Sequence, residues 1–180
     1  IYPDRELTDI QEAEFQQRVE RRCRKDPLAY IVGHREFWSL QFKVNPKVLI
    51  PRPETEGIVE LLRDLAGNEI DEPALRVLEV GTGSGILAIV TAMEFPKARI
   101  TAVDNSREAL EVARENARSH KVAEQIEFVE MDFLRDWILP QSDSYDYILS
   151  NPPYIPSKKL EQLMPDVREF EPQSALDGGS

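Results

Sequence analysis

The stretch LRVLEVGTGSGILAIVTAMEF, residues 75–95, places a short apolar run, a glycine-rich loop and a second apolar run in direct succession. Residues 75–80 are typical of a buried strand, and residues 85–95 predict a helix that stops near Pro96. The loop EVGTGSG, residues 79–85, has glycine at positions 81, 83 and 85. Because glycine has no Cβ, such a loop lets a ligand lie directly against the backbone. The stretch therefore predicts the first strand, ligand loop and helix of an α/β domain.

The chain that follows alternates short apolar runs with a helical pattern. Residues 98–104, 125–132 and 145–151 are expected to form strands. Residues 106–120 predict a helix that Ser106 caps at its N-terminus. Strands that are separated by helices form parallel sheets with right-handed crossovers. We therefore expect the first four strands of a parallel sheet.

The upstream part of the chain is organised differently. Thr8 is expected to cap a helix that ends by Pro27. Residues 36–44 alternate apolar and polar side chains and predict a strand or half a hairpin, and residues 45–57 read as a proline-rich loop. A further helix is expected over residues 55–66. The apolar sides of the two helices are expected to consist of Ile10, Phe15 and Val19 in the first and of Ile58, Leu61, Leu62 and Leu65 in the second.

Composition and charge narrow the classes of function. The 180 residues are 41% hydrophobic and 31% charged, which is typical of a soluble globular domain with a small appendage, and no apolar run reaches the ~20 residues of a membrane span. Residues 1–53 carry a net charge of +2, and residues 54–180 carry −13. Such an acidic body repels phosphate backbones, so nucleic acid is an unfavourable partner. The basic run 18–26 fits a solvated helix face better than a docking site for an acidic partner.

The cysteine and histidine content excludes two further classes. Cys23 is the only cysteine, so no internal disulfide can form. This fits a reducing compartment, either the cytoplasm or an organelle matrix. His34 and His120 lie far apart in the sequence, and we expect no metal site. The charged N-terminal stretch 1–15 has no signal-peptide pattern.

Polar side chains stand at the carboxyl ends of all four expected strands. These residues are Glu79, Asp104, Asp132 and Asn151. In open α/β sheets, ligands bind beyond these strand ends. A carboxylate at position 104 can accept hydrogen bonds from both ribose hydroxyls of a nucleoside. The combination predicts a nucleoside site, whereas the glycine loop alone would also fit a plain structural turn.

The features that the loop lacks indicate which nucleoside it binds. The dinucleotide fingerprint needs a third glycine where this chain has Ile86, and no Gly-Lys-Ser/Thr of a phosphate-binding loop follows. S-adenosylmethionine has a ribose but no pyrophosphate, and Asp132 and Phe133 can meet its adenine, although Phe133 alone would also suit a core position. The residues expected to bind this cofactor are Glu79, Gly81, Thr82, Gly83, Ser84, Gly85, Asp104, Asp132, Phe133 and Asn151.

Three motifs carry a resemblance to a known family. EVGTGSG (79–85), AVD (102–104) and NPPY (151–154) resemble, in this order, the class I methyltransferases that act on planar amide or amino nitrogens. N6-adenine methyltransferases and the HemK/PrmC-type glutamine N5-methyltransferases share this pattern. Residues 27–56 and 166–176 resemble the release factor glutamine methyltransferases. Ribosomal-protein glutamine methyltransferases are close relatives, but IPRPETE looks more like the release factor branch.

The resemblance implies a Rossmann-like class I methyltransferase sheet and a division of the chain. Residues 1–33 would be the end of a helical N-terminal domain, and residues 34–56 a β-hairpin and loop linker. Residues 57–180 would be the methyltransferase domain, without the three further strands that complete the seven-stranded sheet of the family. A cofactor-binding piece that serves as an interaction module is the non-enzymatic alternative.

The resemblance also implies a chemistry for NPPY. An amide nitrogen carries two N–H donors, which the side-chain oxygen of Asn151 and the carbonyl of Pro152 can accept. Pro153 stiffens the segment, and Tyr154 can stack on the planar amide. The implied function is methyl transfer from S-adenosylmethionine to the side-chain nitrogen N5 of the glutamine in the GGQ motif of peptide chain release factors. Adenine-N6 methylation of DNA or RNA and ribosomal-protein glutamine methylation remain the alternatives.

Overall fold

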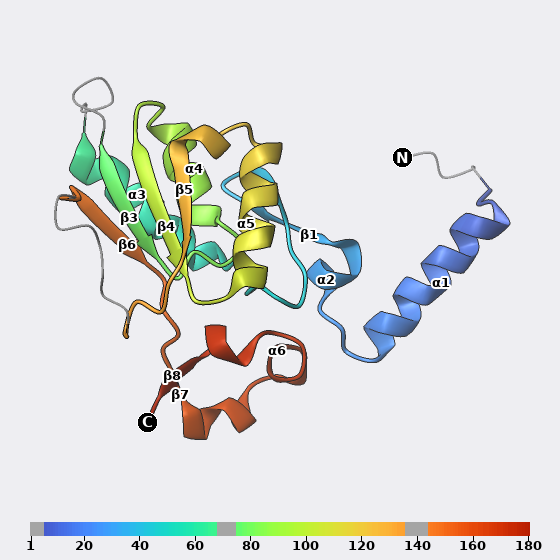
Figure 1. The fold of residues 1–180 in the computed structure, drawn as a ribbon. Coiled ribbons are helices and arrows are strands. Elements are labelled where there is room, and N and C mark those ends of the chain that lie inside the picture. Colours follow the sequence, from blue (N-terminus) through green and yellow to red (C-terminus); the bar gives the residue numbers. More distant parts are fainter. Residues whose placement is uncertain (1–5, 68–74, 136–143) are drawn as a thin grey trace.

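The computed structural model describes residues 6–67, 75–135 and 144–180, and a parallel four-stranded sheet forms its centre (Figure 1). The strands lie in the order β5–β4–β3–β6. Their bounds are β3 Arg76–Val80, β4 Arg99–Asp104, β5 Ile126–Glu130 and β6 Tyr147–Ser150. All four expected strands are present and parallel, so the predicted α/β fold is confirmed.

The strand order places a topological switch beside β3. From β3 the chain proceeds outward to β4 and β5, and then crosses back to form β6 on the other side of β3. Val80 pairs with Val103 of β4 and with Ser150 of β6, so the ends of these three strands lie level with one another. Ligands of open α/β sheets bind at such a point.

Three helices pack beside the sheet. They are α3 Glu56–Ala66, α4 Ile86–Glu94 and α5 Arg107–Ser119. Helix α4 contacts both of the others as well as β4 and β5, and its residues 86–92 are all buried. Ser106 caps α5 by accepting a hydrogen bond from the backbone N–H of Ala109, as predicted. The apolar helix of the opening motif is therefore the centre of the helical layer.

The apolar side predicted for α3 is confirmed at Leu62, which is buried, and at Ile58, which packs against the core, but it was wrong at Leu61 and Leu65. The buried residues are Val59, Leu62 and Ala66, whereas Leu61 is 58% and Leu65 is 63% exposed. Both sets fit a helical period, so periodicity alone could not choose between them. The packing of α3 against α4 decides which side is buried.

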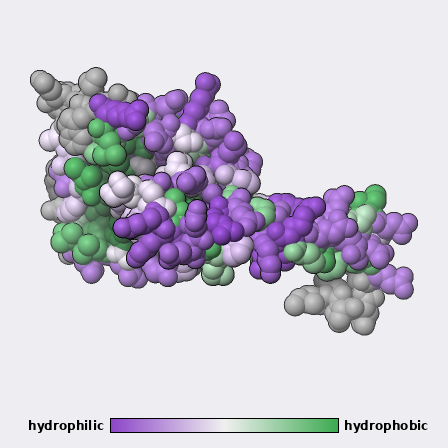
Figure 2. All heavy atoms as spheres, turned by 90° about the horizontal axis from the view of Figure 1, so that it is seen from below, coloured by the Kyte–Doolittle hydropathy of each residue, from purple (hydrophilic) through white to green (hydrophobic). Residues whose placement is uncertain are grey.

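Helix α1, Asp9–Cys23, begins as predicted at Thr8, with a capping box formed with Gln11. Every residue of α1 is described and none is buried, so its sparse apolar side is exposed: Ile10 is 73% and Phe15 is 56% exposed. Figures 1 and 2 show this helix projecting from the main body, with hydrophilic and hydrophobic atoms mixed along its surface.

The segment 36–44 belongs to a β-hairpin, the second of the two predicted forms. Its strands are β1 His34–Phe37 and β2 Leu40–Lys43. Trp38 and Ser39 form the turn with φ of 54° and 58°, the left-handed values that two-residue hairpin turns require. Phe37 and Phe42 are buried and pack edge to face, with ring centroids 6.2 Å apart. They anchor the hairpin in the main core.

The segment after β6 forms a second, smaller unit that the sequence did not predict. It includes the short parallel strands β7 Ile155–Pro156 and β8 Asp177–Gly179. Figure 1 shows this unit next to the end of β6. The short helices among the described residues are α2 Leu28–Val32, η1 Pro53–Thr55, η3 Ala123–Gln125, η4 Ser157–Gln162, α6 Pro165–Arg168 and η5 Gln173–Ala175.

Candidate active site

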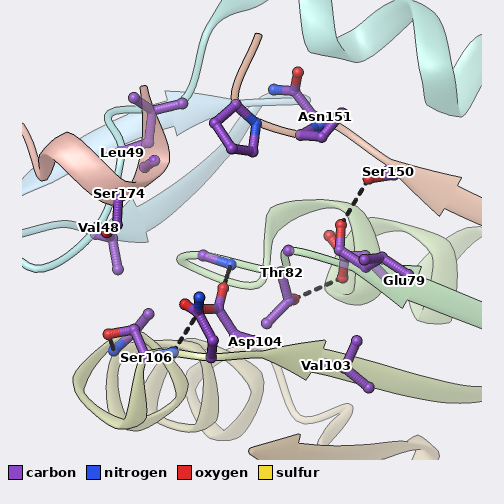
Figure 3. A pocket seen from close by; sticks show the side chains of 18 of the residues that line it. Val48, Leu49, Glu79, Thr82, Val103, Asp104, Ser106, Ser150, Asn151 and Ser174 are labelled. Atoms are coloured by element: carbon purple, nitrogen blue, oxygen red, sulfur yellow. Dashed lines mark hydrogen bonds between the residues drawn. The ribbon is translucent and has the colours of Figure 1, made fainter. Parts of the chain in front are cut away.

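A cavity of about 520 Å³ lies at the carboxyl ends of the four parallel strands (Figure 3). One part of its wall is the glycine loop after β3 together with residues that follow β4 and β5. The other part comes from Asn151–Pro153 after β6 and from two further segments, residues 47–55 and 172–178. Its volume lies within the usual range for small-molecule sites. The cavity is thus at the switch point, where the sequence predicted a ligand.

Gly81 and Gly83 leave the glycine loop open toward the cavity. Their φ angles are 77° and 56°, and a Cβ on either residue would meet no atom within 4 Å. Side chains at such φ values are strained, so glycine is the favoured residue even though there is room. The backbone N–H groups of Gly81 and Thr82 both donate to the carbonyl of Val103, which fastens the loop to β4.

Gly85 has a different task from the other two glycines. It is not among the described residues that line the cavity. A Cβ at this position would lie 3.1 Å from side-chain atoms of Ala113 and Ile89. Gly85, with φ of 83°, therefore permits α4 to start close against α5. This geometry supports a packing role for Gly85, and its contact with a ligand stays a prediction.

Glu79 supports the loop from inside. It is 1% exposed, and its Oε2 accepts hydrogen bonds from Thr82 Oγ1 at 2.6 Å and from the N–H of Ala88 at 3.0 Å. Burial raises the pKa of this carboxyl to about 8, the two hydrogen bonds oppose that rise, and the charge of Asp104 adds to it. Glu79 thus ties the loop to the first turn of α4.

Asp104 lies at the end of β4 and lines the cavity. Its Oδ2 accepts from the N–H of Gly83 at 2.8 Å, and its Oδ1 accepts from the N–H of Ser106 at 2.9 Å (Figure 3). These two bonds fix the plane of the carboxylate. Each oxygen has a second lone pair, so each can still accept a ligand hydroxyl.

Asp132 and Phe133 also line the cavity, beyond the end of β5. Both are half-buried. Asp132 Oδ1 accepts from the N–H of Leu134 at 3.1 Å, and Oδ2 lies 3.4 Å from the guanidinium of Arg135. The structure therefore brings these two residues to the same cavity as Asp104, as predicted from the strand ends.

Only the first three residues of the NPPY segment line the cavity. Asn151, Pro152 and Pro153 line the cavity, whereas Tyr154 is 76% exposed and is not among the described lining residues. Stacking of Tyr154 on an acceptor therefore stays a prediction that requires the acceptor to extend outside the cavity. The hydroxyl of Ser150 donates to the carbonyl of Val80 at 2.9 Å, which holds the end of β6 against β3.

Sequence reasoning did not assign roles to two residues that hold the cavity wall in place. Glu171 is buried and accepts from Arg52 Nη2 at 2.6 Å and from the N–H of Ile50 at 3.1 Å. Asn116 is 2% exposed, donates to the carbonyl of Ser84 at 2.8 Å, and exchanges two hydrogen bonds with the backbone of Lys43. A polar residue on the apolar side of α5 was the available signal for Asn116.

The sequence predicted neither a metal site nor a membrane-spanning segment. In the described part of the chain, no group of three or more histidine, cysteine, aspartate or glutamate residues is arranged to hold a metal ion. None of the helices described has the length and apolar content for crossing a bilayer.

The comparison with known proteins agrees with this site. Residues 59–167 match the family model of the methyltransferase small domain. The chain belongs to this methyltransferase family. Residues 1–33 of this methyltransferase chain match the model of the PrmC N-terminal domain.

Curated relatives confirm the expected resemblance of this methyltransferase. It is 43% identical over 178 residues to the release factor glutamine methyltransferase of Koribacter versatilis, covering 99% of this chain and 61% of that protein. It is 40% identical over 177 residues to that of Rhodopirellula baltica, covering 98% and 59%. The chain thus spans about three fifths of the length of these relatives.

Solved structures show the same fold for this methyltransferase. The N-terminal domain of human METTL16 in complex with SAH matches with a TM-score of 0.52 and 20% identity, covering 63% of this chain and 46% of that chain. At this identity the likeness supports the class I methyltransferase fold and no finer assignment.

Proposed function

We propose that this protein transfers a methyl group from S-adenosylmethionine to the side-chain nitrogen N5 of the glutamine in the GGQ motif of peptide chain release factors. The relatives named release factor glutamine methyltransferases support the acceptor. The observation that carries the proposal is a single cavity whose wall combines Gly81, Gly83 and Asp104 with Asn151 and Pro152. A cofactor half and an acceptor half therefore face each other.

The residues present fit the cofactor. The open backbone at Gly81 and Gly83 suits the methionine part, and the remaining lone pairs of Asp104 suit the two ribose hydroxyls. Asp132 and Phe133 suit the amino group and the face of the adenine. When bound, S-adenosylmethionine supplies a methyl group on a positively charged sulfur. Thr82 and Ser84, both buried in the loop, help to keep its shape.

Asn151 and Pro152 would hold the acceptor. A glutamine amide nitrogen is a weak nucleophile because its lone pair is delocalised into the carbonyl. When Asn151 Oδ1 and the Pro152 carbonyl accept its two N–H groups, the nitrogen is fixed with its lone-pair face free for the methyl group. Such orientation can contribute several kcal/mol, up to about 7–11 in ideal cases. The same two acceptors stabilise the positive charge that develops on nitrogen.

The bond changes require no tuned base. The new N–C bond forms as the C–S bond breaks, and the nitrogen then carries a positive charge and two hydrogens. An amide protonated on nitrogen is a strong acid, so one proton passes to water. The residues of this chain therefore act by positioning and by accepting hydrogen bonds.

The remaining wall gives a reason for a protein acceptor. Segments 47–55 and 172–178 line the cavity together with Asn151, so a loop of the acceptor protein can insert its glutamine among them. The domain carries a net charge of −13 over residues 54–180, which opposes the adenine-N6 alternative on nucleic acid. We further propose that residues 1–33 are the end of a helical N-terminal domain, residues 34–56 a hairpin and loop linker, and residues 57–180 the methyltransferase domain.

A transfer assay tests the proposal. The purified protein receives S-adenosylmethionine labelled in its methyl group, together with a release factor, the same factor with alanine for the GGQ glutamine, or double-stranded DNA. We expect label only in the unaltered release factor, and a short free GGQ peptide to be a much poorer substrate because it lacks remote contacts. Equal labelling of both release factors would place the methyl group elsewhere, and labelling of DNA alone would favour the adenine alternative.

A further inference from the structure

Thr55 is a buried threonine whose hydroxyl faces the NPPY segment. It is 5% exposed and occupies the N-cap position of α3, yet its side chain makes no capping hydrogen bond. Threonine at an N-cap ordinarily accepts from a backbone N–H of the first turn. Here Thr55 Oγ1 instead accepts from Nδ2 of Asn151 at 3.2 Å, across 96 residues of sequence. The hydroxyl is therefore used between two segments of the cavity wall.

This contact engages the nitrogen of the Asn151 amide and not its oxygen. The amide has one nitrogen that only donates and one oxygen that only accepts. With Nδ2 held by Thr55, the oxygen Oδ1 points to the other side of the amide, and within the described part of the chain it accepts no hydrogen bond. Figure 3 shows the Asn151 side chain across the cavity from the glycine loop and Asp104.

We propose that Thr55 is a positioning residue that holds the side chain of Asn151 in place through this hydrogen bond, so that Oδ1 stays available to accept an N–H of the acceptor. The inference rests on the proposed function and deepens it. The Thr55 hydroxyl can accept from Nδ2 or donate to Oδ1, so it fixes where the amide lies, and the N–H groups of the bound acceptor select the orientation that presents Oδ1. If the amide turned over, its NH₂ group would face these N–H groups. Two donors would then oppose each other, and the acceptor nitrogen would lose one of its two fixed contacts.

A pair of substitutions at Thr55 measures this role. Thr55→Val keeps the shape of the side chain and removes the hydroxyl, and Thr55→Ser keeps the hydroxyl. We expect Thr55→Val to lower kcat for the release factor by about 5- to 10-fold, the effect of one lost hydrogen bond, with the Kd for S-adenosylmethionine within about 2-fold of the parent. Thr55→Ser is expected to stay near the parent kcat. Thr91→Val is the matched control, because Thr91 is also buried but its Oγ1 has no hydrogen-bond partner among the described residues.

The same Thr55 substitution in a protein that also carries a change at position 151 distinguishes positioning by the hydroxyl from simple packing. An alanine at position 151 has no polar group for the Thr55 hydroxyl to hold. Thr55→Val added to Asn151→Ala should therefore change kcat by less than about 2-fold. The same loss in both backgrounds would mean that Thr55 acts through packing, and the proposal would be wrong. An unchanged kcat for Thr55→Val in the unaltered background would also overturn it.

A measurement that does not depend on methyl transfer tests this proposal independently of the proposed function. Solvent exchange of the Asn151 side-chain NH₂ protons can be followed by NMR in the parent and in Thr55→Val. We expect slow exchange in the parent and faster exchange in the variant, even if release factor is not the acceptor. Equal exchange in both proteins would contradict the anchor, whereas slow exchange in the parent combined with no methylation of release factor would contradict only the proposed acceptor.

Discussion

Arg52 and Glu171 join two segments of the cavity wall by an ion pair of 2.6 Å between residues that are 119 positions apart. The Glu171 side chain is 1% exposed and that of Arg52 is 35% exposed. Glu171 also accepts from the N–H of Ile50. The loop that contains IPRPETE and the segment after α6 are thereby fixed to each other beside Asn151.

Replacing Arg52 tests this connection. Arg52→Met leaves a buried carboxylate with its charge uncompensated, so we expect a loss of about 1–3 kcal/mol in the free energy of unfolding, less than for a fully buried pair because Arg52 is partly exposed. We also expect a higher KM for the release factor with unchanged affinity for S-adenosylmethionine. Urea unfolding and steady-state kinetics measure these effects.

Lys43→Met is the control, because it breaks an exposed ion pair with Glu115. It should lower the free energy of unfolding by at most about 1 kcal/mol. An equal loss of unfolding free energy in both variants would refute the role of Arg52.

Asn116 links the hairpin, α5 and the glycine loop, so its replacement should affect both stability and cofactor binding. Asn116→Ala leaves the carbonyl of Ser84 and both backbone groups of Lys43 without their partner. We expect a loss of about 2–4 kcal/mol in unfolding free energy. Asn116→Asp keeps an acceptor for the Lys43 N–H but can no longer donate to either carbonyl, so it should also weaken binding of S-adenosylmethionine in calorimetry. Cofactor affinity that survives in both variants would show that the loop holds its shape without Asn116.

Glu79 should give the stability a specific pH dependence. Its folded-state pKa is raised to about 8 by burial, so the folded protein favours the protonated form. Between the ordinary glutamate pKa of about 4.3 and this value, the folded state binds more protons than the unfolded state, and stability therefore falls as pH rises through this window. Glu79→Gln removes the titration. The stability of the parent relative to this variant should be highest below pH 4.3, decrease up to about pH 8 and then level off; a pH-independent difference in urea unfolding would contradict the assignment.

Asp104 is the residue on which cofactor affinity should depend most directly. Asp104→Ala removes the acceptor for ribose hydroxyls and also frees the N–H of Gly83. We expect binding of S-adenosylmethionine to weaken by about 1.5–3 kcal/mol, the usual range for hydrogen bonds to a charged group. Asp104→Asn, which keeps one acceptor oxygen, should lose less. Calorimetry that finds the parent affinity in Asp104→Ala would remove this residue from the site.

The sequence was informative where the structure is local or follows from topology. The glycine loop, the cap at Ser106 and the four strands are encoded in short windows, and parallel topology then places Asp104, Asp132 and Asn151 at one end of the sheet. These parts of the fold and of the cavity wall were predicted correctly.

The sequence was uninformative where a role depends on a partner far along the chain. Thr55 looked like an ordinary residue at the start of a helix, and its contact with Asn151 exists only because η1 and the segment after β6 meet in space. Gly85 matched its neighbouring glycines in pattern, but Ala113 of α5 determines its role. Tyr154 lies next to lining residues, yet the chain turns it outward. A short stretch of sequence carries no signal for such contacts, because each depends on a residue far along the chain.

The central claim is that Asn151 positions a release factor glutamine for methylation, and the direct measurement is the methyl content of that glutamine by peptide mass spectrometry. We expect one added methyl group on the GGQ glutamine with the parent protein, and a rate lower by about 10²-fold or more with Asn151→Ala, whose free energy of unfolding should change little because Asn151 lies at a strand end. Asn151→Asp, which still accepts hydrogen bonds, should retain more activity than Asn151→Ala. A parent rate in Asn151→Ala, or methylated adenine in DNA with an unmodified glutamine under the same conditions, would contradict the claim.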